Sequence, residues 1–142
     1  MSTAIIGIGN IASTIARHLV GGGESVVVAA RDESQAKALA DELGPNARAA
    51  SVEDAISGAD AVVLALWLED LREVIPRQAG LFGGKVVIDP SNPIGFEANG
   101  QSFRTLPEDQ SSGSIVSALL PAGARRPRRS KAARVSATPR YA

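Results

Sequence analysis

The sequence has no cysteine and only one histidine among its 142 residues. Without cysteine, disulfide bonds, a thiolate nucleophile and a cysteine-ligated metal are all excluded. Aromatic residues make up only 4% of the chain, so the core has to be built from Ala, Val, Ile and Leu. No apolar run approaches the roughly 20 residues that a membrane-spanning helix needs, and no basic segment precedes the first apolar run, as a secretory signal would require. We therefore expect a protein without a membrane segment, located in the cytoplasm.

Acidic residues are missing from the C-terminal end, although the chain as a whole has no net charge. Residues 1–123 hold all 15 acidic and 8 of the 15 basic residues, a net charge of −7, whereas residues 124–142 hold the remaining 7 basic residues. The 44% hydrophobic content is typical of a folded protein, and the length suits one domain. We predict one folded domain over residues 1–123 and a basic, disordered tail over residues 124–142.

Short apolar runs alternate with helical patterns along the first domain. Strands are expected near residues 3–8, 25–30, 47–50, 61–66 and 85–89, with helical segments between them. Such alternation requires a parallel sheet with right-handed crossovers, and unbroken apolar strands indicate a sheet covered on both faces. The sequence thus predicts an α/β fold, a Rossmann-type doubly wound parallel sheet with strand order 3-2-1-4-5, incomplete at its C-terminal end. Residues 94–109 are predicted to form a polar loop.

The turn after the first strand reads Gly7-Ile8-Gly9-Asn10-Ile11-Ala12. In a dinucleotide-binding turn the first glycine allows the tight bend, the second lets the backbone approach a pyrophosphate, and a small third residue permits close helix–strand packing. The following helix would place the positive end of its dipole at the same turn, which stabilises an anion. We predict that Gly7, Ile8, Gly9, Asn10 and Ile11 bind a dinucleotide; a plain strand–helix turn without a ligand is the alternative.

The second expected strand ends in Ala30-Arg31-Asp32. NAD-binding sites place a carboxylate here, about 20 residues after the glycines, for the ribose 2′-hydroxyl. Arg31 instead offers a guanidinium that pairs with a 2′-phosphate, so we predict NADP(H) as the cofactor. Two alternatives stay open: Arg31 is a solvated loop charge, or a one-residue shift puts the Asp32 carboxylate at this position. Lys37 is either a second support for the phosphate or a helix-surface charge.

Together with Asp89-Pro-Ser-Asn92-Pro93 after the fifth strand, these features resemble the NADP-binding N-terminal domain of the coenzyme F-420 (8-hydroxy-5-deazaflavin)-dependent NADP oxidoreductases. The resemblance covers about residues 3–123. It implies hydride transfer between NADPH and a deazaflavin, or another small-molecule redox acceptor. It also implies catalysis by positioning of two rings, without a catalytic side chain or a metal. The single histidine, His18, fits that expectation as a surface residue of the first helix.

By position, the resemblance also assigns Leu66 and Trp67 to the cofactor wall beyond the fourth strand, and Asn92 to the nicotinamide side. The family has a small residue and a proline where this chain has Leu66-Trp67. Trp67 therefore stacks on a ring, narrows the site, or covers the sheet as part of the core. Many members have a serine where this chain has Ala30, so the predicted NADP preference rests mostly on Arg31.

In the family, the chain continues with a sixth strand and further helices that complete the pocket for the second substrate. Here residues 124–142 are rich in Arg, Pro, Ala and Ser, and Pro127 and unpaired arginines do not suit a buried strand. Three interpretations compete: a disordered tail that contacts nucleic acid or acidic partners, a reading-frame slip, and a short cofactor-binding module. Nucleic-acid binding is not favoured, because no aromatic residues are interleaved with the charges. We favour the frame slip, because the change begins where the family's next strand should start.

The leading hypothesis is an NADP(H)-binding domain of an oxidoreductase that transfers hydride between NADPH and a deazaflavin or similar acceptor, with weak or no turnover because half of the site is missing. One alternative is a non-catalytic dinucleotide-binding or interaction module. Another is the NADP-binding half of a different reductase, such as a pyrroline-carboxylate reductase or a hydroxyacid dehydrogenase. An incomplete sheet would expose an apolar edge, so a homodimer or poor solubility is also expected.

Overall fold

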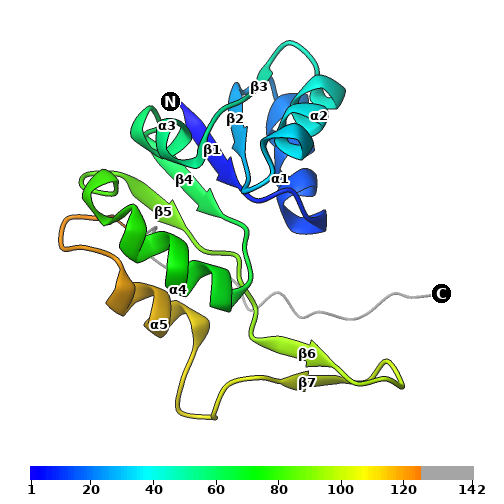
Figure 1. Ribbon diagram of the computed structural model, residues 1–142, viewed down its shortest axis with the longest axis vertical. Coiled ribbons are helices and arrows are strands. Elements are labelled where there is room, and N and C mark those ends of the chain that lie inside the picture. Colours follow the sequence, from blue (N-terminus) through cyan, green and yellow to red (C-terminus); the bar gives the residue numbers. More distant parts are fainter. Residues whose placement is uncertain (126–142) are drawn as a thin grey trace.

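The computed structural model describes residues 1–125, which fold around a five-stranded parallel sheet (Figure 1). The strands lie in the order β3-β2-β1-β4-β5, so the predicted doubly wound sheet and its strand order are confirmed. Most of the predicted basic tail, residues 126–142, lies outside the described residues. The strand bounds are β1 (Thr3–Ile6), β2 (Val26–Ala29), β3 (Ala47–Ala49), β4 (Ala61–Leu64) and β5 (Val86–Ile88).

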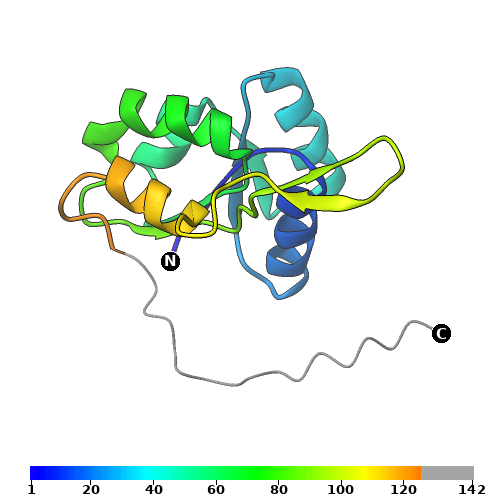
Figure 2. The ribbon, with the colours of Figure 1, turned by 90° about the horizontal axis from the view of Figure 1, so that it is seen from below.

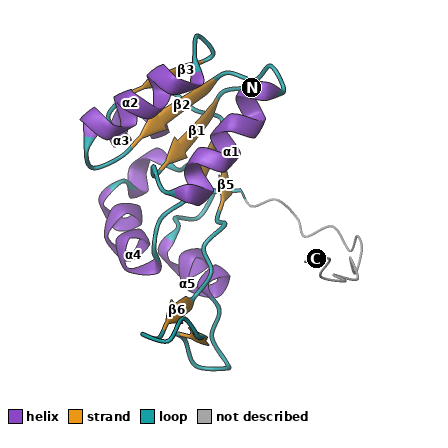
Figure 3. Ribbon diagram, turned by 90° about the vertical axis from the view of Figure 1, so that its right-hand side faces the viewer, coloured by secondary structure: helices purple, strands orange, loops and turns teal. Residues whose placement is uncertain are grey.

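Helices cover both faces of the sheet (Figures 2 and 3). Alternate residues of each strand point to opposite faces, and β1 illustrates this: Ile5 packs in the core layer that includes α1 (Asn10–Gly21) and α2 (Glu33–Leu43). Ile6 packs in the opposite layer, with α3 (Val52–Ser57), α4 (Leu68–Arg77) and α5 (Ser112–Leu119). The strands β1, β2 and β4 are buried along their whole length, as their unbroken apolar sequences require.

The helix after β4 ends close to a proline. Pro76 lies inside the last turn of α4, which ends at Arg77. A 3-10 turn, η1 (Ala79–Leu81), follows directly. None of the helices within residues 1–125 is both long and apolar enough to cross a membrane.

The predicted polar loop over residues 94–109 is wrong in part, because it contains an antiparallel hairpin, β6 (Ile94–Phe96) and β7 (Ser102–Arg104). The hairpin projects from the body of the molecule (Figures 1 and 3). Its strands have three residues each and are mostly exposed, so they carry no run of apolar residues that marks a strand. The detectable signal was Asn99-Gly100, a typical hairpin-turn dipeptide, in which Gly100 has φ +84°.

The free edge of β5 pairs with the last described residues. The backbone N–H of Arg125 donates to the carbonyl of Lys85, and its carbonyl accepts from the N–H of Val87, both at 2.7 Å. Ala124 packs against the core beside them. The domain boundary after residue 123 stays a prediction, and backbone pairing to the sheet extends two residues past it.

Candidate functional site

One cavity of about 830 Å³ lies at the carboxyl ends of the central strands. Its walls come from the segments that follow β1, β2, β4 and β5, and from one side of α4. This is the edge where doubly wound sheets bind their ligands, at the point where the strand order reverses. The structure brings all nine residues singled out in the sequence to this cavity: Gly7, Ile8, Gly9, Asn10, Ile11, Arg31, Leu66, Trp67 and Asn92.

Gly7 is required by the backbone at the turn between β1 and α1. Its φ is +123°, a conformation that side-chain-bearing residues rarely adopt. A Cβ at this position would lie 2.3 Å from the carbonyl oxygen of Ala65, after β4. The N–H of Gly7 donates to the carbonyl of Ala29 at 2.8 Å. Gly7 therefore lets the turn pass between the ends of two neighbouring strands, whether or not a ligand is bound.

Gly9 has no such structural requirement. A Cβ there would have nothing within 4 Å, and its φ of −69° suits any residue. Gly9 is the N-cap of α1 and provides no side-chain cap. By contrast, side chains cap α2, α3 and α5. The first N–H groups of α1 therefore keep their hydrogen-bonding capacity beside the cavity, where they form a site of positive potential.

Asp32 follows Arg31 but serves a different element. Its carboxylate accepts hydrogen bonds from the backbone N–H groups of Ser34 and Gln35 and from both of their side chains, at 2.5–3.3 Å. The bond from the Ser34 hydroxyl, followed by that from the backbone N–H of Gln35, holds the pKa of Asp32 below its ordinary value. Asp32 is thus the N-cap of α2, and its hydrogen-bonding capacity is largely taken up there.

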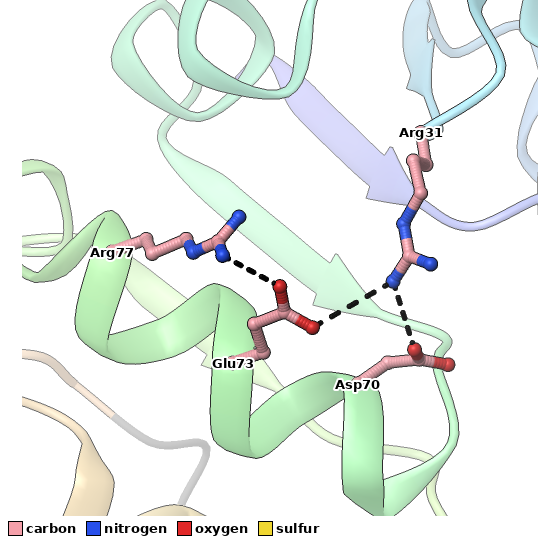
Figure 4. A network of polar contacts seen from close by, with 4 residues as sticks. All are labelled: Arg31, Asp70, Glu73 and Arg77. Carbon is pink, nitrogen blue, oxygen red and sulfur yellow. Dashed lines mark hydrogen bonds and ion pairs between the residues drawn. The ribbon is translucent and has the colours of Figure 1, made fainter.

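The Arg31 side chain extends instead toward α4 (Figure 4). Its Nη2 atom lies 3.1 Å from a carboxylate oxygen of Asp70 and 3.9 Å from one of Glu73. The other carboxylate oxygen of Glu73 lies 2.8 Å from Arg77. All four residues line the cavity. They form a charged network, named here the Arg31–Arg77 network, that joins the loop after β2 to one face of α4.

Sequence reasoning missed Asp70, Glu73 and Arg77. Their spacing of three and four residues places them on one face of a helix, and that much was readable from the sequence. Nothing local indicates that this face lies opposite Arg31, because β2 and β4 are separated by β1 in the sheet. The pairing depends on the order of the strands and on the direction in which α4 leaves β4.

Three predicted residues lie farther along the cavity. Trp67 is the N-cap of α4 and is 66% exposed, so it is not part of the core. Leu66 is half-buried and packs against the core below. Asn92 is exposed, and its carbonyl accepts a hydrogen bond from the N–H of Ile94 at 2.8 Å. Phe96, which the sequence analysis placed in a loop, lines the same cavity from β6 and is 64% exposed.

Within residues 1–125, the titratable side chains of the cavity lining are the four members of the Arg31–Arg77 network and Asp32. The lining, among the residues that the structure describes, includes no histidine, lysine or cysteine. His18 lies exposed in α1, as expected, and is not among the lining residues. The site therefore combines a helix N-terminus, a charged network and exposed aromatic side chains around an open volume.

A sequence model of the family described as "NADP oxidoreductase coenzyme F420-dependent" matches residues 2–93. The metalloreductase STEAP3 of Rattus norvegicus is 30% identical over 118 residues, which are 83% of this chain and 22% of STEAP3. A solved structure of a hypothetical protein from Sinorhizobium meliloti is 28% identical, with a TM-score of 0.76, over 89% of this chain and 59% of that one.

A structure described as an F420-dependent NADP-reductase, from Arthrobacter sp. FB24, shares the fold with a TM-score of 0.73 at 22% identity. The match includes 87% of this chain and 60% of that one. The chain therefore spans about three fifths of the two solved structures and about a fifth of the metalloreductase.

Proposed function

The chain belongs to the coenzyme F420-dependent NADP oxidoreductase family, an NADP-binding oxidoreductase family, and from this we propose that the nine predicted residues hold NADP(H) in the cavity. The observation that carries the proposal is their convergence on one cavity, although they come from four separate parts of the chain. The proposal assigns the segment from Gly7 to Ile11 to the pyrophosphate, Arg31 to the 2′-phosphate, and Leu66, Trp67 and Asn92 to the nicotinamide half.

The β1–α1 turn supports the pyrophosphate assignment. A Cβ placed on Gly9 would have no atom within 4 Å. A ligand therefore has room to approach the backbone here, and a side chain would take up that room. The N-terminus of α1 has no side-chain cap and no acidic residue in its first turn. An anion bound there accepts hydrogen bonds from free N–H groups and is stabilised by the helix dipole. The residues present therefore fit a pyrophosphate.

Arg31 and Asp32 support a preference for NADP(H) over NAD(H). A carboxylate at the end of β2 favours a free ribose 2′-hydroxyl, but the Asp32 carboxylate is occupied as the cap of α2. Arg31 is 79% exposed and lines the cavity, so its guanidinium is accessible to a phosphate. A guanidinium pairs with phosphate oxygens through two parallel hydrogen bonds.

The proposed activity is hydride transfer between NADPH and a deazaflavin or a similar acceptor. When bound, NADPH supplies the hydride, and no side-chain acid or base is needed for that transfer. The role of this chain is to orient the nicotinamide half between the β4–α4 and β5–β6 segments. The exposed rings of Trp67 and Phe96 along the cavity suit stacking against a planar acceptor.

Acceptor-dependent oxidation of NADPH tests this activity. Purified chain is mixed anaerobically with NADPH and, in separate reactions, an 8-hydroxy-5-deazaflavin, a free flavin or a ferric chelate. The ferric chelate is included because of the 30% identity to a metalloreductase. Turnover is expected to be weak, because this chain spans about three fifths of the two solved structures, and the deazaflavin is expected to give the fastest loss of NADPH absorbance. A faster reaction with iron would contradict the acceptor. Binding of NADPH without turnover of any acceptor would support the cofactor site but not hydride transfer by this chain.

A further inference from the structure

The charges of the Arg31–Arg77 network are unevenly balanced. Glu73 lies between two arginines, with one carboxylate oxygen near Arg31 and the other 2.8 Å from Arg77. Asp70 forms an ion pair, among the residues that the structure describes, with Arg31 alone. If Arg31 turns toward another anion, Glu73 keeps its partner and Asp70 loses its own. Asp70 is then the uncompensated carboxylate at the rim of the cavity.

A phosphate at Arg31 competes directly with this arrangement. Arg31 has one guanidinium, and its Nη2 atom already donates to Asp70 at 3.1 Å. A phosphate dianion has to displace the carboxylate or share the guanidinium with it. In either case two like charges lie within several ångströms of each other, which is unfavourable. The Asp70 carboxylate imposes no such penalty on NADH, which lacks the 2′-phosphate.

We infer that Asp70 is a specificity-determining residue: it competes with the 2′-phosphate of NADPH for Arg31 and lowers the preference of the site for NADPH over NADH. The inference rests on the proposed NADP(H) site. In the proposed site Arg31 favours binding of the 2′-phosphate, and the inference adds Asp70 as a residue that disfavours it. The discrimination between the two cofactors then depends on the balance between Asp70 and Arg31, and not on Arg31 alone.

The expected size of the effect follows from the exposure of the pair. Arg31 is 79% and Asp70 34% exposed, and exposed ion pairs are individually weak because solvent screens them. Releasing Arg31 from Asp70 is therefore expected to tighten NADPH binding by roughly two- to tenfold. Added salt weakens both the ion pair and the repulsion, so the gain shrinks as ionic strength rises.

Binding titrations of Asp70→Asn with NADPH and NADH test the inference. The gain is expected for NADPH, with the Kd for NADH unchanged within about twofold. Glu73→Gln is expected to give a smaller gain, because Glu73 lies 3.9 Å from Arg31 whereas Asp70 lies 3.1 Å from it. The matched control is Glu69→Gln, which removes a carboxylate from the same first turn of α4 but at a position that does not line the cavity. Circular dichroism of each variant checks that the total helix content is unchanged.

The double variant Arg31→Gln/Asp70→Asn identifies the route of the effect. If Asp70 acts by competing for Arg31, the gain from Asp70→Asn is lost when Arg31 is absent. A full gain that persists without Arg31 overturns the inference, as does unchanged or weaker NADPH binding by Asp70→Asn alone. If the unmodified chain binds neither cofactor, the proposed function itself fails. Binding by the unmodified chain without a gain in the variant removes only the role of Asp70.

Discussion

Arg31 and Asp70 meet across the cavity, with a guanidinium nitrogen of one 3.1 Å from a carboxylate oxygen of the other. The two residues belong to the segment after β2 and to α4, which approach each other only in the folded chain (Figure 4). Their contact identifies the charge environment that a 2′-phosphate would enter. The assignment of Arg31 to the 2′-phosphate therefore predicts measurable changes in cofactor binding.

Replacing Arg31 by glutamine is expected to weaken NADPH binding by roughly ten- to a hundredfold, because a hydrogen bond to a charged group contributes about 1.5–3 kcal/mol. The Kd for NADH should change little, since NADH has no 2′-phosphate. Titration of both cofactors measures the two effects. Arg17→Gln is a suitable control, because Arg17 pairs with Glu42 on the surface and does not line the cavity. An equal loss for both cofactors would show that Arg31 does not recognise the phosphate.

Gly7→Ala is expected to damage the fold itself. The substitution forces an unfavourable φ and a contact of 2.3 Å with the backbone carbonyl of Ala65, for a combined cost of roughly 2–5 kcal/mol. Urea unfolding followed by circular dichroism measures this loss. A variant as stable as the unmodified chain would contradict the geometry of the β1–α1 turn.

Gly9→Ala is expected to weaken cofactor binding and to change stability little. A methyl group at Gly9 meets nothing within 4 Å, and alanine is a poorer N-cap than glycine, so stability should fall by no more than about 1 kcal/mol. NADPH binding should weaken by roughly tenfold or more, because the methyl group occupies the space that the pyrophosphate needs. Gly80→Ala is the control, since that position is also open but lies outside the cavity lining. Unchanged cofactor binding by Gly9→Ala would place the pyrophosphate elsewhere.

Asp32→Ala is expected to destabilise the chain in a pH-dependent way. The pKa of Asp32 is lowered in the folded protein by its bonds to Ser34 and Gln35, so the ionised carboxylate stabilises the fold above its ordinary pKa. This contribution is lost as the pH falls below the ordinary value of 3.8 and through the folded value. The difference in unfolding free energy between the two proteins should therefore be largest near neutral pH and shrink in acid.

A hydroxyl cap provides the comparison for that experiment. Ser111 caps α5 through the N–H of Ser114, and a serine hydroxyl does not titrate in this range. The destabilisation caused by Ser111→Ala should stay constant over the same acid range. If Asp32→Ala shows an equally constant cost, its carboxylate is not the stabilising group.

The sheet and the glycine turn were predictable because local sequence determines them. Unbroken apolar strands require a sheet covered on both faces, and their alternation with helices leaves few possible strand orders. Gly7 occupies a backbone position that only glycine adopts easily. For these features the sequence pattern and the three-dimensional requirement coincide.

Other features depend on contacts that no local pattern encodes. The hairpin of β6 and β7 has mostly exposed strands of three residues, so only its Asn99-Gly100 turn was visible in the sequence. The capping of α2 by Asp32 became visible only in its hydrogen bonds with Ser34 and Gln35, and the assignment of Arg31 to the 2′-phosphate stays a prediction. The role of α4 in the charged network required the order of the strands to be known.

Parallel titrations of the unmodified chain with NADPH and with NADH test the central claim most directly. Trp67 is the single tryptophan of the chain and lines the cavity, so its fluorescence reports binding at this site. The account predicts that both cofactors quench Trp67, and that NADPH binds roughly tenfold or more tightly than NADH. Equal affinities, or tighter binding of NADH, would contradict it.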